Sequence, residues 1–385
     1  MDIVGIICEY NPFHNGHIYH LQKVKELFPN SMIVLIMSGN FTQRGIPSII
    51  DKWNKTEIAL TYGVDLVVEL PFVFATQSAD IFAKGAIQLL KALRCQYLVF
   101  GSEEDNVEEL EYLAKFVTNN LEYEEKVKTY LDLGNNYPTS LNKALYDLSQ
   151  KEIKLPNDLL GFSYVKEIIK QNAPMKPITI KRTNHYHNTS LDNNHISSAT
   201  SIREAYQNHS AWEEEVPKET IDIMKDSIFL LENYFPFLKY KIMTSKDLSI
   251  YQTVDEGIEN KLKKEIEKST SISDLIHKLK TKRYTYNKLS RMLIHILCNF
   301  TKTDASKMKE IEYIRVLGFS RMGQNYLNTI KKNCTYPIIT TFSKENSKML
   351  AYEKIVTSVY ASILPEKEKI ALIEAEYKNK PKMKG

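Results

Sequence analysis

The sequence has few cysteines and no long apolar run. Its four cysteines, Cys8, Cys95, Cys298 and Cys334, include no CxxC pair, which favours a reducing compartment over a disulfide-stapled secreted protein. The strongest apolar stretch, residues 66–75, is interrupted by a glutamate and a proline, so it cannot span a bilayer. No basic-then-apolar signal opens the chain. We therefore expect a cytoplasmic protein that has no membrane partner.

A large charge of one sign is also absent. The net charge is only +4 over 385 residues, so the field of the whole molecule says little about a polyanionic partner, and any such argument must rest on local clusters. The 43% of apolar and 25% of charged residues are ordinary for a globular protein, and the length suffices for two domains.

The first two hundred residues alternate between strand-like and helix-like segments. Short apolar runs predict strands at residues 3–7, 32–37, 64–70, 97–100 and 177–180. Apolar residues at helical spacing predict helices at residues 53–62, 79–93 and 107–117. This alternation is typical of an α/β fold whose parallel sheet is covered on both faces and binds ligands beyond the carboxyl ends of its strands.

The pattern changes near residue 212, after which the chain has few strand-like runs. Long charged stretches predict helices at residues 221–231, 257–268 and 289–300. We therefore expect an α/β catalytic domain over residues 1–211 and a mainly helical domain over residues 212–385. Residues 213–215 are expected to form a linker or a helix start, and the lysine-rich tail 378–385 is expected to be mobile.

The most informative motif is His14-Asn15-Gly16-His17, which lies where the first strand turns into the first helix. Backbone N–H groups and the helix dipole favour phosphates at such a position, Gly16 permits close approach of a ligand, and Pro12 stiffens the turn. His14 and His17 are the candidate catalytic residues, because they can donate hydrogen bonds as charge builds during attack on the α-phosphorus of ATP.

Two other interpretations of these histidines exist. A histidine near a helix start is commonly a cap or a surface residue. With His20 one turn further on, a three-histidine metal site is also conceivable, but neither cysteine nor acidic partners stand at ligand spacing. The strand–loop–helix context favours nucleotide binding.

Three later residues are expected at the same edge of the sheet. Gly101 follows a strand, where it can either approach a nucleotide or form an ordinary turn. Asn157 can contact a base or ribose, although Asn157 or Asp158 can equally be a helix N-cap. Arg182 closes a strand, where a guanidinium would face the nucleotide.

A second phosphate site is predicted at residues 196–203, where hydroxyl groups and an arginine open a helix. Ser198, Ser201 and Arg203 are its candidate ligands for the distal phosphates and the leaving pyrophosphate. A helix cap by Ser197 or Ser198 explains the serines equally well, but it does not explain the arginine.

These motifs resemble those of adenylyltransferases that carry HxGH early and an ISSxxIR-like motif late, here with one extra residue. Four longer stretches are more specific: residues 9–17 (EYNPFHNGH), 37–45 (MSGNFTQRG), 63–71 (GVDLVVELP) and 317–323 (LGFSRMG). Together they resemble the bacterial tRNA(Met) cytidine acetate ligase family over nearly the whole chain.

The resemblance implies a Rossmann-like nucleotidyltransferase domain and a two-step reaction. Acetate attacks the α-phosphate of ATP to give acetyl-adenylate and pyrophosphate, and N4 of the wobble cytidine of elongator tRNA(Met) then takes the acetyl group and releases AMP. It implies no acetyl-CoA, and a divalent cation such as Mg²⁺ is left open. It also implies that ATP is bound by Gly101, Asn157, Arg182 and the first motif, namely Ile7, Cys8, Glu9, Tyr10, Asn11, Pro12, Phe13, His14, Asn15, Gly16, His17, Ile18, Tyr19 and His20. We place the acyl-adenylate side of the pocket at residues 38–40, where a simple turn is the alternative.

A basic segment supports an RNA partner. Residues 275–303 contain no Asp or Glu, and lysine or arginine contacts to phosphates with tyrosine stacking suit single-stranded RNA. The candidate tRNA-binding residues are Lys278, Lys280, Lys282, Arg283, Tyr284, Lys288 and Arg291. A solvated helix face is the alternative, and Arg315 and Arg321 are expected to extend the basic surface if RNA binds there.

Two other functions fit the same ATP motif. One is an adenylyltransferase for a small phosphorylated metabolite, which would need little beyond the α/β unit. The other is an RNA-binding protein whose nucleotide pocket is regulatory. A second domain that grips a polyanion separates the ligase from the metabolite enzyme, and acetate-dependent exchange between ATP and pyrophosphate separates either enzyme from the regulatory protein.

Overall fold

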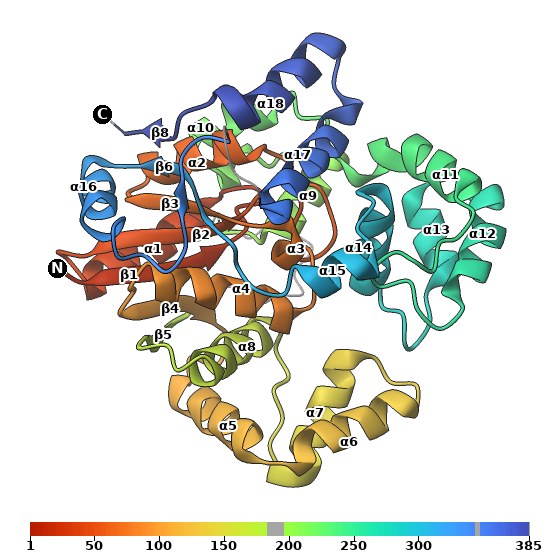
Figure 1. Ribbon diagram of the computed structural model, residues 1–385, viewed down its shortest axis with the longest axis horizontal. Coiled ribbons are helices and arrows are strands. Elements are labelled where there is room, and N and C mark those ends of the chain that lie inside the picture. The colour runs from red at the N-terminus through yellow and green to blue at the C-terminus, as the bar shows by residue number, and fades with distance from the viewer. Residues whose placement is uncertain (183–195, 343–346, 385) are drawn as a thin grey trace.

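One mostly parallel sheet forms the centre of the computed structural model, which describes residues 1–182, 196–342 and 347–384 (Figure 1). Within these residues the sheet has eight strands in the order β5-β4-β1-β2-β3-β6-β7, with β8 paired to β6. The strands are β1 (Ile3–Cys8), β2 (Met32–Ser38), β3 (Leu66–Leu70), β4 (Tyr97–Ser102), β5 (Lys176–Lys181), β6 (Ile314–Phe319), β7 (Ile338–Ile339) and β8 (Lys382–Met383). Strands β1 to β5 pair in parallel and β6 runs antiparallel to β3. The α/β class predicted from the sequence is confirmed.

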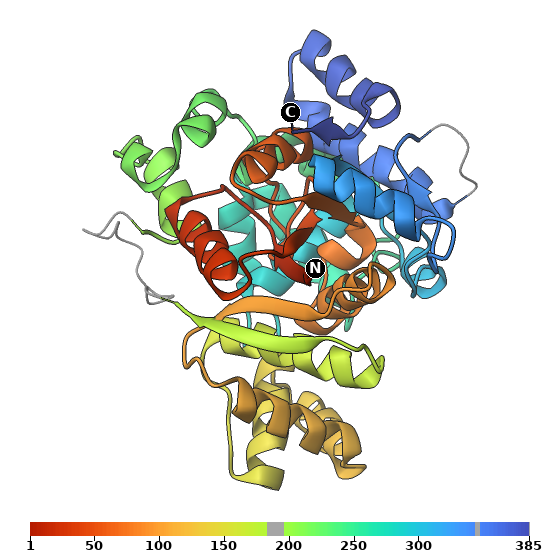
Figure 2. The same ribbon diagram turned by 90° about the vertical axis from the view of Figure 1, so that its left-hand side faces the viewer.

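Helices cover both faces of the sheet, because side chains alternate along its strands. On β1, Ile3 and Ile7 join a core that includes residues of α4 and α8, whereas Val4 and Ile6 join a second core with α1 and α2. The helices of the first half are α1 (Asn15–Leu27), α2 (Lys52–Thr61), α3 (Phe72–Ala75), α4 (Ala79–Ala92), α5 (Val107–Asn119), α6 (Glu122–Asp132), α7 (Tyr137–Ser149), α8 (Pro156–Lys170) and α9 (Ala199–Gln207). Figure 2 shows α5 to α7 gathered below β5.

The strand order places a ligand-binding crevice between β1 and β4. The chain leaves β1 toward β2 and β3 on one side, and it later returns to β4 and β5 on the other. Ligands of doubly wound sheets bind outside the carboxyl ends of the strands where the winding reverses. The HxGH loop follows β1 directly, and Gly101 lies near the carboxyl end of β4.

The second half of the chain is mainly helical, and it also completes the sheet. Its helices are α10 (Lys218–Met224), α11 (Phe235–Thr244), α12 (Ile258–Lys268), α13 (Ile272–Leu279), α14 (Tyr286–Leu297), α15 (Lys302–Lys307), α16 (Arg321–Ile330), α17 (Lys348–Tyr360) and α18 (Glu366–Lys378). Helices α11 to α14 lie together at the right of Figure 1, whereas β6, β7 and β8 extend the sheet beyond β3. The division at residue 212 therefore stays a prediction, and strand pairing crosses it.

Two local predictions were wrong. The helix expected over residues 221–231 ends at Met224, because the chain turns at Ser227, whose hydroxyl donates to the Ile49 carbonyl oxygen at 2.5 Å. The tail expected to be mobile instead forms β8, where Lys382 pairs with Gly318 of β6. The lysines of the tail suggested solvation, but sequence composition does not show that β6 offers an open edge.

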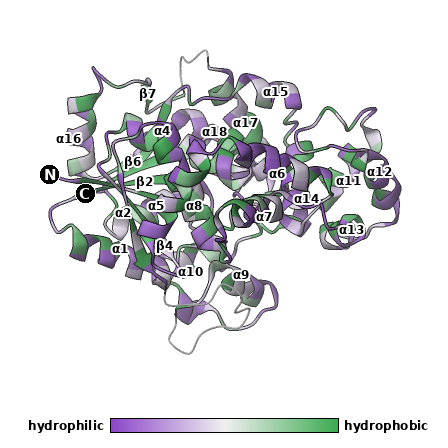
Figure 3. Cartoon of the chain, turned by 90° about the horizontal axis from the view of Figure 1, so that it is seen from below, coloured by the Kyte–Doolittle hydropathy of each residue, from purple (hydrophilic) through white to green (hydrophobic). Residues whose placement is uncertain are grey.

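The outer helices are amphipathic. Helix α12 buries Ile258, Leu262 and Ile266 beneath a charged outer surface, and it carries both hydrophobic and hydrophilic colours in Figure 3. Throughout the three described ranges, every helix is too short or too polar to cross a membrane.

Four buried charges join the two halves of the chain. Lys52 of α2 contacts Glu69 of β3 at 2.7 Å and Glu376 of α18 at 2.8 Å. Arg315 of β6 contacts the same two carboxylates at 3.2 and 2.5 Å. All four side chains are at most 5% exposed. The sequence suggested that Arg315 extends a basic RNA surface. That expectation is wrong for Arg315, because its buried guanidinium neutralises two core carboxylates.

A third carboxyl, that of Glu353 beside this cluster, gives stability a dependence on pH. Burial raises the pKa of Glu353 to about 8, and the charge of Glu69 adds to the shift. The folded chain then holds a proton that the unfolded chain releases, so stability falls as the pH rises from the usual glutamate range toward 8, by at most about 1.4 kcal/mol per pH unit. We expect Glu353→Gln to remove this part of the dependence, as measured by urea unfolding at pH 5.5, 6.5 and 7.5. The matched change Glu366→Gln, at an exposed side chain, should leave the slope unchanged; equal slopes for wild type and Glu353→Gln would contradict the assignment.

Candidate active site

The first motif folds into a helix start that fixes both histidine rings. His14 is the N-cap of α1, and its Nδ1 accepts the N–H of Gly16 at 3.1 Å. The backbone N–H of His14 donates in turn to Nδ1 of His17 at 3.2 Å. Because each Nδ1 is an acceptor, each neutral ring carries its proton on Nε2. The cap interpretation of His14 is thus correct. Among the described residues the Nε2–H of each ring has no hydrogen-bond partner, so both donors are available to a ligand.

The site keeps these rings uncharged. Burial lowers the pKa of His14 to about 3 and that of His20 to about 4, and the charge of Arg182 adds to both shifts. Burial also holds the pKa of His17 well below its usual range, with a contribution from His14. Neutral rings cannot neutralise phosphate charge by themselves, so that task falls to the arginines.

No three metal-ligating side chains among the described residues are arranged to hold an ion.

One cavity of about 710 Å³ brings most of the predicted site together. From the first motif and the later positions it is lined by Ile7, Cys8, Glu9, Tyr10, Asn11, His14, Gly16, His17, Tyr19, His20, Gly101, Asn157, Arg182, Ser198 and Arg203. The remaining members, Pro12, Phe13, Asn15, Ile18 and Ser201, do not line it. Phe13 is fully buried in the core, and Asn15 donates to the Glu214 carbonyl oxygen at 2.8 Å, so these two support the loop.

Arg182 is the cavity cation best placed for a phosphate. It follows β5, and a Cβ atom on Gly101 would lie only 3.2 Å from its Cγ, so the glycine leaves room for the arginine side chain. Its Nε is buried and has no hydrogen-bond partner among the described residues. A buried guanidinium nitrogen without an acceptor loses its hydration, which destabilises the fold. An anionic ligand at this position would accept its hydrogen bond and offset that loss.

The residues at the start of α8 support the neighbouring turn. Leu155 is the N-cap, so the alternative interpretation, in which Asn157 or Asp158 caps this helix, is wrong. Asp158 instead accepts the Ser102 hydroxyl and the N–H groups of Glu103 and Glu104. Asn157 donates to Glu103 at 2.6 Å and borders the cavity.

The second phosphate motif is partly a helix cap. Ser198 is the N-cap of α9 and accepts the Ser201 N–H at 3.1 Å, so the cap interpretation of the serines is correct. Arg203 donates to the Asn11 carbonyl oxygen and, at 3.3 Å, to the Thr200 hydroxyl. It therefore fastens α9 to the HxGH loop while it borders the cavity.

The basic segment meets the same cavity through three of its seven predicted residues, namely Arg283, Lys288 and Arg291. Arg283 also pairs with Glu256, Lys278 pairs with Asp274 at 2.7 Å, and Lys288 lies 4.0 Å over the buried ring of Tyr284. Lys280 and Lys282 are exposed outside the cavity. Tyr284 donates to the Asp255 carbonyl oxygen, so its ring is packed and not offered for stacking.

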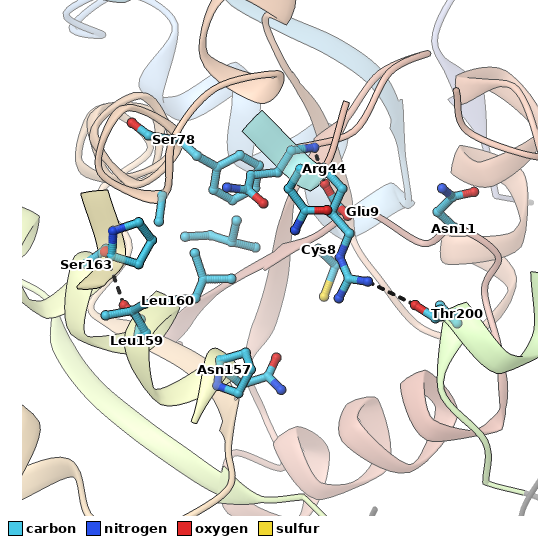
Figure 4. Close-up of a pocket in the computed structure, with 18 of the residues that line it drawn as sticks. Cys8, Glu9, Asn11, Arg44, Ser78, Asn157, Leu159, Leu160, Ser163 and Thr200 are labelled. Atoms are coloured by element: carbon cyan, nitrogen blue, oxygen red, sulfur yellow. Dashed lines mark hydrogen bonds between the residues drawn. The ribbon is translucent and has the colours of Figure 1, made fainter. Parts of the chain in front are cut away.

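Sequence reasoning missed the loop between β2 and α2. Gln43 and Arg44 line the cavity, and Arg44 donates to Thr200 at 2.9 Å, as Figure 4 shows. Their stretch was noticed only for its resemblance to a family, because nothing in its composition marks a ligand site. The residues placed at the acyl-adenylate side, 38–40, do not line the cavity. The carbonyl oxygens of Ser38 and Gly39 accept from buried Lys55, which explains their turn as structural.

Comparisons with known proteins show the family to which the chain belongs. A family model described as HIGH Nucleotidyl Transferase matches residues 1–374. A curated Geobacillus protein named tRNA(Met) cytidine acetate ligase is 40% identical, with 99% of each chain covered, and one from Anoxybacillus flavithermus is 41% identical over 99% of this chain and 100% of its own. The apo crystal structure of Thermotoga maritima TmcAL superposes with a TM-score of 0.90 at 30% identity, covering 100% of this chain and 99% of that one, and a form bound with alpha-thio ATP superposes with 0.88 at 28% over the same shares. The chain belongs to the HIGH nucleotidyl transferases and, among them, to the tRNA(Met) cytidine acetate ligase family.

Proposed function

We propose that this protein is an ATP-dependent tRNA(Met) cytidine acetate ligase. In the first step an acetate oxygen bonds to the α-phosphorus of ATP, the bond to the β-phosphate breaks, and pyrophosphate leaves. In the second step N4 of the wobble cytidine of elongator tRNA(Met) bonds to the acetyl carbon, AMP leaves with the electron pair of the acyl–oxygen bond, and N4 loses one proton.

The observation that carries this proposal is a cavity with both an adenylation end and a basic wall. The Nε2–H groups of His14 and His17 and the guanidinium groups of Arg182 and Arg203 border one end, and such donors stabilise charge that develops on phosphate oxygens. The basic wall comes from Lys288 and Arg291 of α14, a helix far away in the sequence. An adenylyltransferase for a small metabolite would not need that wall, whereas an enzyme that receives an RNA nucleotide would.

The direct test is incubation of the purified protein with ATP, labelled acetate and tRNA, followed by mass spectrometry of the nucleosides. We expect acetyl label on cytidine and, without tRNA, acetate-dependent exchange between pyrophosphate and ATP. Acetyl-CoA in place of ATP and acetate should give no label. Label transferred from acetyl-CoA alone would overturn the acyl-adenylate route, and exchange that ignores acetate would favour the metabolite enzyme.

The exposed lysines between α13 and α14 are expected to contact tRNA outside the cavity. Removing one lysine–phosphate interaction lowers the salt slope of binding by roughly 0.7 to 0.9 units, so Lys280→Ala/Lys282→Ala should weaken tRNA binding and reduce the slope by between one and two units. Filter binding over a salt series measures both quantities. The matched pair Lys331→Ala/Lys332→Ala follows α16 at the opposite side of Figure 1 and should bind like the wild type. Equal salt slopes for both double variants would indicate that Lys280 and Lys282 lie on a solvated surface that does not contact tRNA.

A further inference from the structure

A single residue, Gln43, connects two charged side chains of the cavity. Its backbone N–H donates to Glu9 Oε1 at 2.6 Å, and its carbonyl oxygen accepts from Arg291 Nη1 at 3.2 Å. All three residues line the cavity, and Figure 4 shows Glu9 beside Arg44. The backbone of Gln43 thus bridges the carboxylate of Glu9, which follows β1, and the guanidinium of Arg291 on α14.

The loop around Gln43 is locked against α14. Gly45 has φ of +75°, and a Cβ atom there would lie 2.3 Å from the backbone nitrogen of Arg291. Ser290 also donates to the Gly45 carbonyl oxygen at 2.9 Å. The positive φ and the close approach of the Arg291 backbone both require glycine at position 45. The spacing of Glu9 and Arg291 is therefore preorganised before a ligand binds.

Neither charge makes a direct ion pair in the part of the chain that the structure describes. Near Glu9, the Lys55 ammonium bonds to the Glu9 carbonyl oxygen at 2.9 Å, and burial lowers the pKa of Lys55 to about 7 while the charge of Glu9 opposes that shift. Asp80 and Asp255, the other carboxylates that line the cavity, pair with Lys166 and Lys302, at 2.5 and 2.9 Å. Glu9 and Arg291 make no ion pair with a described residue. Burial lowers the pKa of Arg291 to about 10, as expected for a cation that is withdrawn from water without a compensating carboxylate.

A ligand with an N–H donor at one end and an anionic group at the other would satisfy both side chains. ATP phosphates do not suit Glu9, because like charges repel. A cytidine of an RNA strand does suit the pair, since its exocyclic amine is a donor and its phosphodiester is an anion.

We propose that Glu9 and Arg291 form the acceptor-nucleotide subsite of the ligase reaction. The Glu9 carboxylate accepts a hydrogen bond from cytosine N4. As the N4–acetyl bond forms and the acyl–oxygen bond to AMP breaks, Glu9 takes the departing proton and later releases it to water. Arg291 pairs with a phosphate of the same nucleotide. This assignment rests on the proposed function, and it gives the Glu9 side chain a role separate from ATP binding.

The test compares the two half-reactions in Glu9→Gln. The glutamine keeps an oxygen to accept the Gln43 N–H but cannot take a proton, so acetyl transfer to tRNA in a single turnover should fall on the order of a hundredfold relative to acetate-dependent pyrophosphate exchange. Glu57→Gln, at an exposed carboxylate of α2 that lies outside the cavity and is also paired with a lysine, is the matched control and should keep the wild-type ratio of the two rates. Melting temperatures of both variants report their folding.

Arg291→Gln tests the other end of the subsite. Its amide can still donate to the Gln43 carbonyl oxygen, but the charge is removed, so we expect the KM for tRNA in acetyl transfer to rise about tenfold, as for the loss of one charge-assisted hydrogen bond. An unchanged KM would remove Arg291 from the subsite.

The outcomes separate this inference from the proposed function. If the wild type forms no acetylcytidine, the ligase function itself fails. If the wild type is active and Glu9→Gln lowers exchange and transfer by the same factor, Glu9 acts on ATP, through adenine or a metal ion, and the subsite is wrong. A Glu9→Gln variant that transfers acetyl at the wild-type rate would also overturn it.

Discussion

His17→Ala is expected to lower the rate of acetyl-adenylate formation about a hundredfold to a thousandfold, with a much smaller effect on ATP affinity. The backbone N–H of His14 occupies Nδ1 of His17, so Nε2–H is the ring donor that faces the cavity. A donor aimed at charge that grows on the α-phosphate stabilises the transition state more than the bound substrate, and the loss of one such donor typically costs this much in rate. Pyrophosphate exchange with saturating acetate measures the rate.

Two controls keep this result interpretable. The substitution also removes the capping bond to His14, which is worth about 1 kcal/mol, so a melting curve must show that the variant is folded under the assay conditions. His277→Ala, at an exposed histidine of α13 outside the cavity, should retain the wild-type exchange rate. Exchange by His17→Ala at close to the wild-type rate would show that the ring does not act on the reacting phosphate.

The largest effect on stability is expected from Arg315→Met. The substitution leaves Glu69 and Glu376 buried with only Lys52 to neutralise them. Removing one partner of a buried ionic group typically costs 3 to 5 kcal/mol, roughly, because the remaining charge is uncompensated. Urea unfolding of the wild type and the variant at pH 7 measures the difference in the free energy of unfolding.

The matched control is Arg321→Met on α16, where the exposed guanidinium bonds to Gln324 alone among the described residues and a change of less than about 0.5 kcal/mol is expected. Equal destabilisation by both substitutions would mean that the buried cluster contributes no more than a surface arginine. A loss confined to Arg315→Met would confirm that this cluster ties β6 and α18 to the sheet.

The sequence predicts well which residues meet at the HxGH end of the cavity, because the signals there are local. His14 and His17 stand at a strand–helix junction that apolar spacing reveals, and the cap that orients their rings is formed within four residues. Gly101 lies near the end of β4 and Arg182 follows β5, and the parallel pairing of these two strands brings both residues to the same edge of the sheet.

The remaining features depend on contacts between distant segments. Nothing near Gln43 shows that Arg291 will reach its carbonyl oxygen, 248 residues away in sequence. Lys52 and Arg315 look like ordinary surface charges until their helix and strand are packed together. The antiparallel pairing of β6 with β3 was missed for the same reason, since a short apolar run carries no information about its partner.

The buried cluster also sets an order of events during protein synthesis. The ribosome makes Lys52 and Glu69 long before Arg315, and Glu376 emerges last of the four. Until α18 has left the exit tunnel, the nascent chain holds two cations of the cluster against one carboxylate, and β6 lacks its pairing with β8. Folding from the N-terminus during synthesis can therefore build the nucleotide pocket early, but the sheet acquires its full stability only when the last helix docks.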